Sequence, residues 1–217
     1  MKAEVSKDLN DSANDFKHVV WPQIKHWCQD GEIIPMETVT DSNFAKRLDM
    51  LAGIDAWQVV SGKGIRGVAS RVQYQYKMVF DPKAKRMVEK KQFTKPYASF
   101  TVRKMRSSGA ETEWAKRIRA IDDPGNWLAP SLIIQAYLDR RGGRLLAAFM
   151  VENNKMFEFA KSDFENSVYE IKPNRYDGNL MAIFWVKWLE QYSVKVKQFV
   201  QDDINCMYPN KDPQYPF

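Results

Sequence analysis

The sequence has few of the residues that build disulfide frameworks and metal centres. Its 217 residues include two cysteines, Cys28 and Cys206, and two histidines. Two cysteines this far apart exclude a disulfide framework and a Cys-rich zinc site, and they suit a reducing compartment. His18 and His26 are eight residues apart, whereas paired metal ligands on a helix stand about three or four apart, so we expect no histidine metal pair.

Long apolar runs are also missing. No stretch approaches the ~20 apolar residues of a membrane span, and the N-terminal MKAEVSKDLNDSAND lacks the apolar core of a signal peptide. We therefore expect a cytoplasmic protein that does not associate with membranes. The sequence has no GxSxG motif, P-loop, HExxH motif or Rossmann fingerprint, which excludes the common hydrolase, nucleotide-binding and zinc-protease classes.

The composition is that of a folded, mildly basic protein. Hydrophobic residues make up 44% of the chain, and 33 Lys and Arg against 27 Asp and Glu give a net charge of +6. Such an excess favours an anionic partner if it is clustered. We expect one domain over residues 1–217, with an irregular Pro-rich tail near 205–217.

Apolar spacing and turn residues predict a mixed arrangement of helices and strands. The predicted fold class is α/β (α+β), a central mixed β-sheet with hairpins, flanked by helices. Helices are expected at 8–30, 41–51 and 109–122, and strands at 54–60, 65–79, 96–104, 132–139, 145–152, 155–160 and 179–191.

The best-defined hairpin joins the strands at 54–60 and 65–79. If Gly62-Lys63-Gly64 is a three-residue turn, Asp55 lies opposite Arg71, and alternation places Gln73, Gln75 and Lys77 on the face of Arg71. A two-residue turn would instead place Asp55 opposite Ser70 and separate it from this polar column. We favour the first register because it sets an acid beside counter-charges.

An acid on one strand that faces polar side chains on the next can hold Mg²⁺ through oxygen ligands. With this order of elements, residues 10–105 resemble the PD-(D/E)xK nuclease superfamily, a restriction-endonuclease-like group. Its members carry an acid on one strand and a Glu or Gln, one intervening residue and a Lys on the next. The resemblance implies a Mg²⁺-dependent DNA nuclease, with Mn²⁺ as an alternative ion and Asp55 as the metal-binding acid.

Two segments compete for the second part of that pattern. Gln75-Tyr76-Lys77 matches it literally, but Gln75 lies four residues beyond the position facing Asp55, about 13 Å along the strand. Gln73-Tyr74-Gln75 is nearer, so we favour Gln73 as the ligand, Gln75 near the Lys position, and Arg71 or Lys77 as the positive charge. The resemblance also implies upstream acids, for which the candidates are Glu37 and Asp49.

Basic residues suggest two places for nucleic acid. Arg103, Lys104 and Arg106 precede the helix at 109–122 and are candidate phosphate contacts near its N-terminus, and Arg71 on the hairpin is a further candidate contact to nucleic acid. The basic run from Lys83 to Lys95 is either an arm along a nucleic-acid backbone or a solvated hairpin tip.

Three functions follow from these features. The first is a Mg²⁺-dependent endonuclease acting on DNA. The second is a catalytically inactive nuclease-like module, of phage or mobile-element type, that binds DNA or a protein partner. The third is a structural or inhibitory protein. The expected partner is nucleic acid, DNA first, and a homodimer is left open.

Overall fold

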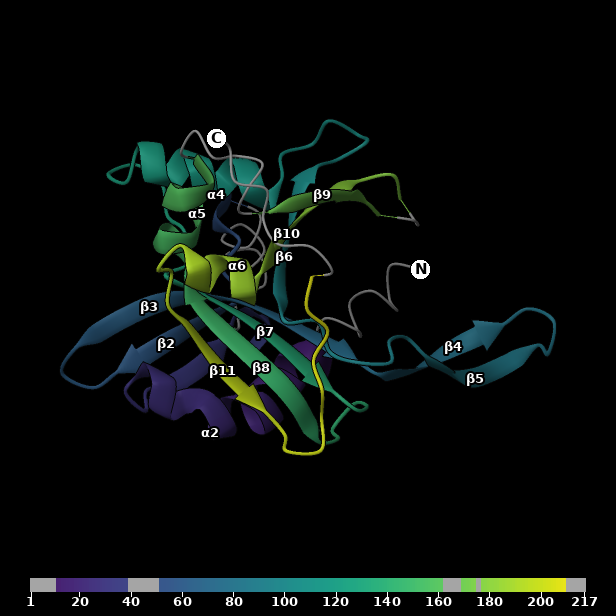
Figure 1. Cartoon of the computed structure of the whole chain (residues 1–217). Coiled ribbons are helices and arrows are strands. Elements are labelled where there is room, and N and C mark those ends of the chain that lie inside the picture. Colours follow the sequence, from purple (N-terminus) through teal and green to yellow (C-terminus); the bar gives the residue numbers. More distant parts are fainter. Residues whose placement is uncertain (1–10, 39–50, 162–168, 175–176, 210–217) are drawn as a thin grey trace.

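The central feature of the fold is a mixed sheet of six strands. The computed structural model describes residues 11–38, 51–161, 169–174 and 177–209 (Figure 1). The strand order is β1-β2-β3-β7-β8-β11. These strands are β1 (Glu32–Pro35), β2 (Ala56–Val60), β3 (Gly64–Tyr74), β7 (Leu132–Leu138), β8 (Leu145–Glu152) and β11 (Val196–Val200). Only β3 and β7 pair in parallel, so the predicted mixed α+β class is confirmed.

Different layers cover the two faces of this sheet. One face carries a smaller sheet, β6-β10-β9, and helices that lie beside it (Figure 1). These elements are β6 (Ser99–Met105), β9 (Glu170–Pro173), β10 (Leu180–Trp185), α4 (Glu113–Asp122), α5 (Asn153–Lys161) and α6 (Val186–Gln191). The other face carries the N-terminal helical segment η1 (Phe16–Val20), α2 (Trp21–Ile24) and η2 (Lys25–Cys28), and the short η3 (Met36–Thr38) follows β1. No helix in the described ranges is long and apolar enough to cross a bilayer.

Side-chain alternation along β7 creates two separate cores. All seven residues of β7 are buried, as expected for a strand covered on both faces. Ile133 and Tyr137 belong to the core beneath the smaller sheet, whereas Ile134 and Ala136 pack against the N-terminal helix. Gln135, on the side of Ile133, is the one polar residue in the strand.

The N-terminal helix accommodates a proline within its length. Residues 11–28 are helical, close to the predicted 8–30, and Pro22 lies in the first turn of α2. Immediately before it, the Trp21 backbone N–H bonds to the carbonyl of Phe16 in a wider π-helical turn. Because proline has no N–H to donate, a change of helical pitch at this point lets the chain continue without breaking.

One predicted strand is helical in the structure, and a second is helical in its latter half. Residues 155–160 lie in α5, where Asn153, Met156, Phe157 and Ala160 are buried at helical spacing. The stretch 179–191 begins as β10 and continues as α6. The first prediction was wrong and the second was confirmed only over Leu180–Trp185, because short apolar runs do not distinguish a buried strand from a buried helix.

The charged excursion after β3 is a separate two-stranded sheet. β4 (Tyr76–Asp81) and β5 (Arg86–Lys91) pair antiparallel and project from the body of the molecule (Figure 1). Asp81 accepts hydrogen bonds from the backbone N–H groups of Lys83 and Ala84, which closes the turn. We call residues 76–91 the ribbon.

Gly31 lies where the N-terminal helix meets β2. Its carbonyl accepts a bond from the Trp21 indole. A Cβ at this position would approach the Gln58 side chain at 2.7 Å and the Val59 carbonyl oxygen at 2.8 Å. Only a residue without a side chain allows this approach.

We expect Gly31→Ala to destabilise the protein by about 1–3 kcal/mol, because overpacking forces the β2 backbone to move. The measurement is chemical denaturation followed by circular dichroism. Gly125→Ala is the matched control, because nothing lies within 4 Å of a Cβ there. Equal stabilities of the two variants would contradict this account of Gly31.

Candidate functional site

The hairpin that carries Asp55 forms with a different register from the predicted one. Val60 pairs with Gly64 and Ala56 with Val68, so the connecting residues are 61–63 and the pairing continues toward Asp55 and Ala69. The prediction that Asp55 faces Arg71 was therefore wrong by two residues. An even shift keeps each side chain on its predicted face, because strand side chains alternate with a period of two.

Asp55 lines a small polar cavity between the six-stranded sheet and α4. Its carboxylate accepts a hydrogen bond from the Ser70 backbone N–H at 2.7 Å. The cavity, about 60 Å³, is also lined by Arg71, Thr101, Glu113, Arg117 and Gln135. The structure thus brings together residues from the hairpin, β6, α4 and β7.

Arg71 links the two walls of this cavity. Its Nη1 donates to the Thr101 carbonyl oxygen at 3.1 Å, and its Nη2 lies 3.8 Å from the Glu113 carboxylate. Glu113 in turn accepts from the Arg103 backbone N–H. The predicted phosphate contact Arg71 is therefore engaged in an ion pair within the protein.

Arg117 is the most deeply buried charge at the site. Its side chain packs over the Phe157 ring and the residue is 5% exposed. Burial lowers the pKa of Arg117 to about 10, although Glu113 and Asp55 oppose this effect. Its Nε and Nη1 atoms have no hydrogen-bond partner in the part of the chain that the structure describes.

Glu113 balances these guanidinium groups. Burial alone would raise the pKa of Glu113, but Arg71, the Arg103 N–H and Arg117 outweigh it and hold that pKa below its ordinary value. Sequence reasoning missed Glu113 and Arg117 because each resembles a routine residue of an amphipathic helix. Their separation of four residues, which places them on one helix face, was the available signal.

The cavity fits a divalent cation poorly. Two carboxylates and the Gln135 amide are ligand types that Mg²⁺ accepts. However, Arg71 and Arg117 line the same space and already neutralise both carboxylates. No group of three or more His, Cys, Asp and Glu residues gathers anywhere in the described ranges.

The other predicted metal-site residues do not join Asp55. Gln73 pairs with Tyr137, four residues along β3 from Ala69 and hence about 13 Å away, so its predicted closeness to Asp55 was wrong. Gln75 follows the end of β3 and donates to the Thr94 carbonyl. Lys77 pairs with Lys90 in the ribbon, a different sheet. The strand ends at Tyr74, which separates these positions from the Asp55 cavity.

For two further predicted metal ligands, the structure gives no side-chain position. Glu37 lies in η3, and its side chain is outside the described set. Asp49 lies outside the described residues altogether. Their predicted role as metal ligands stays a prediction.

The predicted phosphate corner before α4 is largely occupied. The Lys104 ammonium bonds to the Tyr169 hydroxyl at 2.6 Å and lies over the Trp114 ring. Thr112 caps α4 by accepting from Ala115 N–H. Arg103 and Arg106 each have a buried Nε without a hydrogen-bond partner in the described part of the chain. A capped helix end beside Glu113 offers phosphate little attraction.

The excess positive charge of the protein is concentrated in the ribbon. Residues 76–91 carry six Lys or Arg and two acidic residues, a net +4 out of +6 for the whole chain. Within the described residues, Lys83, Lys85, Arg86 and Lys90 form no ion pair with an acid. The clustering that would favour an anionic partner is therefore present on this element.

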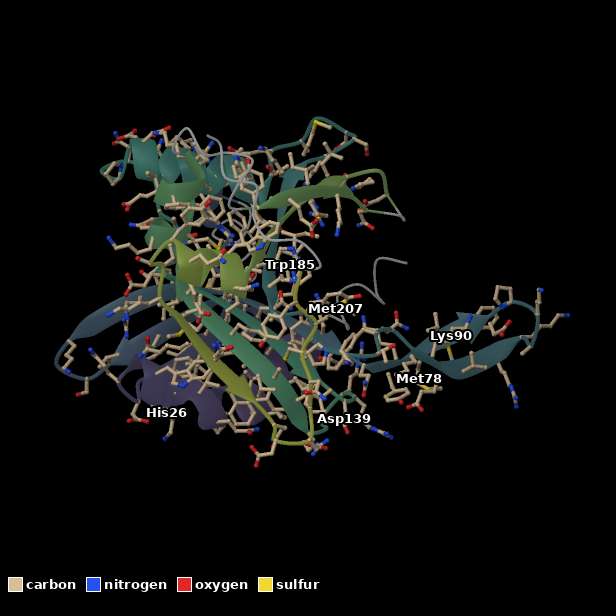
Figure 2. All side chains as sticks on the ribbon, in the orientation of Figure 1. His26, Met78, Lys90, Asp139, Trp185 and Met207 are labelled. Atoms are coloured by element: carbon tan, nitrogen blue, oxygen red, sulfur yellow. The ribbon has the colours of Figure 1, made fainter. Side chains whose placement is uncertain are left out.

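The ribbon also exposes large apolar side chains. Phe80 pairs with Met87, and alternation places Met78 on the same face. Met78 is 59% exposed and Phe80 57%. Lys77, Lys90 and Arg86 lie on the opposite face, and Figure 2 shows Met78 and Lys90 on this projecting element.

Comparison of the chain with protein-family models, with curated proteins and with solved structures gave no match.

We expect Glu113→Gln to lower the free energy of unfolding by about 1–3 kcal/mol near neutral pH, because it removes the acid that pairs with Arg71 and one of the two acids near Arg117. A carboxylate whose pKa falls below its ordinary 4.5 in the folded state stabilises the protein above that pH. This contribution disappears as the pH drops through the lowered value. The difference between wild type and variant should therefore shrink under acid conditions, as measured by urea denaturation at several pH values.

Glu111→Gln is the control for this experiment. Glu111 precedes α4 and pairs with Arg119 of that helix at the surface, where ion pairs contribute little. If the loss of unfolding free energy in Glu113→Gln did not change with pH, this would contradict the role of Glu113 as the ionised partner of Arg71 and Arg117.

Proposed function

We propose that this protein binds duplex DNA through the ribbon and does so without cleaving it. The observation that carries this proposal is the concentration of net charge, +4 of +6, on one projecting two-stranded element (Figure 1). The polar cavity at Asp55 supports the non-catalytic form of the proposal, because its carboxylates are matched by buried guanidinium groups.

The charge on the ribbon suits a phosphate backbone. Cations that have no protein acid to neutralise can replace the counterions condensed on DNA, and the release of those ions drives binding. Lys83 and Lys85 lie at the turn, and Arg86 and Lys90 lie on one face of β5. Contacts could thus form along the length of the ribbon.

The shape of the ribbon suits a groove. The major groove of B-DNA, about 12 Å wide, admits a two-stranded β-ribbon. Apolar side chains on such an element can contact thymine methyl groups or insert between base steps. Met78, Phe80 and Met87 are available for these contacts on the face opposite Arg86 and Lys90.

The base of the ribbon is joined firmly to the central sheet. Gln75 N–H donates to the Leu138 carbonyl and Tyr76 N–H to the Asp139 carbonyl, both at 2.8 Å. The Gln92 N–H donates back to Gln75 at 2.7 Å. The end of β7 therefore orients the ribbon, which lowers the entropic cost of ordering it on DNA.

We expect the double variant Arg86→Ala/Lys90→Ala to weaken binding to a 30-base-pair duplex. The slope of log K against log salt should fall by about 2, since about one unit is lost with each phosphate contact. Fluorescence anisotropy between 50 and 200 mM salt measures both quantities. Lys25→Ala, an exposed lysine on the N-terminal helix, is the control and should leave the slope unchanged.

Phe80→Ser separates apolar contacts from charge. It should reduce affinity at every salt concentration and leave the slope as in the wild type, because no phosphate contact is removed. Unchanged slopes in the Arg86→Ala/Lys90→Ala variant, or tighter binding to single strands than to duplex, would overturn the assignment of duplex binding to the ribbon.

The alternative function, metal-dependent hydrolysis at Asp55, has a separate test. We expect wild-type protein to leave supercoiled plasmid uncut in Mg²⁺ or Mn²⁺, because Arg71 and Arg117 already neutralise the carboxylates that would have to bind the metal ion in the cavity. Asp55→Asn, which keeps an acceptor for the Ser70 N–H, should behave in the same way. Cleavage by the wild type that a chelator stops and Asp55→Asn abolishes would establish the hydrolase instead.

A further inference from the structure

A second cavity of the described protein is far larger than the Asp55 site. It has a volume of about 720 Å³ and lies where β7 begins, β8 ends and β11 begins. Residues of η2 and α5 and of the α6–β11 loop complete it. Its volume is within the range of small-molecule sites, roughly 300–1,000 Å³.

The floor of this cavity is apolar. Leu132, Met150 and Val194 are buried there. Cys28 belongs to the same floor, with its sulfur 3.1 Å from the Met150 sulfur. Burial raises the pKa of Cys28 to about 11, so the thiol stays protonated and serves as an apolar surface rather than a nucleophile.

Aromatic rings form part of the walls. The rings of Phe159 and Tyr192 lie 4.7 Å apart with an interplanar angle of 38°. Trp27 lines the cavity from η2. Flat aromatic surfaces favour a planar occupant, which can stack on them.

The polar lining is predominantly cationic. Arg66, Lys155, Lys195 and Lys197 line the cavity, against Glu152 and Glu158. Arg66 gives an N–H to the Cys28 carbonyl and Lys197 gives one to the Trp27 carbonyl. A guanidinium has five N–H groups and an ammonium three, so both retain donors for an anion.

We propose that this cavity binds a planar aromatic anion, with the ring system against Phe159 and Tyr192 and the anionic group near Arg66 and the lysines. The volume, the apolar floor, the ring pair and the charge balance each support this chemistry. The site is separate from the ribbon and does not depend on the proposed DNA binding.

The probe for this site is 1-anilinonaphthalene-8-sulfonate, an aromatic sulfonate with a planar naphthalene ring, whose fluorescence rises in apolar surroundings. We expect one equivalent to bind per chain. Lys155→Glu/Lys195→Glu changes two exposed rim residues and should weaken binding by roughly tenfold. Phe159→Leu keeps apolar volume but removes a ring face, and should weaken binding as well. Circular dichroism checks that each variant is folded.

Two ribbon variants are the matched controls. Lys83→Glu/Lys85→Glu makes the same charge change away from the cavity, and Met78→Ser/Phe80→Ser removes exposed apolar side chains of the ribbon. Both should bind the probe as the wild type does. Loss of binding in the ribbon variants, or wild-type binding in the cavity variants, would overturn the proposal.

Competition identifies the source of the anion. Displacement of the probe by dAMP would assign a nucleotide, and displacement by 1-naphthoate alone would assign an aromatic carboxylate. Displacement only by laurate, or by none of the three, would overturn the assignment of a planar aromatic ligand.

Discussion

The parallel pairing of β3 with β7 is the constraint on which the rest of the structure depends. Seven residues of each strand are in register, from Val68 with Leu132 to Tyr74 with Leu138. Because side chains alternate, this register decides which residues enter each of the two cores. A shift of one residue would bring Val68 and Val72 into the core beneath the smaller sheet and expel Ala69 from it.

The eleven residues of β3 also connect the three regions of chemical interest. Arg66, near its start, lines the large cavity. Ser70 and Arg71, in its middle, contribute to the Asp55 cavity. Tyr74 ends the strand, and two residues later the chain enters the ribbon. This one strand thus sets the distances between the large cavity, the Asp55 cavity and the ribbon.

Much of this fold could be predicted from local patterns, but the geometry of the site could not. Hairpins and the helix ending in Asp122 follow from turn residues and amphipathic spacing. The register at Asp55 was missed because Gly62 and Gly64 both have positive φ angles, so either could mark the turn. The association of Glu113 with Arg71 depends on tertiary packing of α4 on the sheet, between residues more than forty positions apart, and no local pattern records it.

The aromatic contacts of Lys104 likewise could not be predicted from the sequence. A lysine one residue before the end of a strand is typical of a solvated contact, yet the ammonium of Lys104 lies over the rings of both Trp114 and Tyr169. The tyrosine comes from a segment 65 residues further along the chain. Cation–π contacts of this kind depend on distant aromatic residues, which a pass along the sequence does not bring together.

The ribbon has a consequence for how the protein can change over evolutionary time. Its strands contribute none of the residues that form either core, so substitutions along them leave folding almost untouched. The attachment at Gln75 and Tyr76 uses main-chain groups, which almost any residue supplies. The fold therefore places little constraint on the sequence of the ribbon, which can change while the sheet beneath it stays the same.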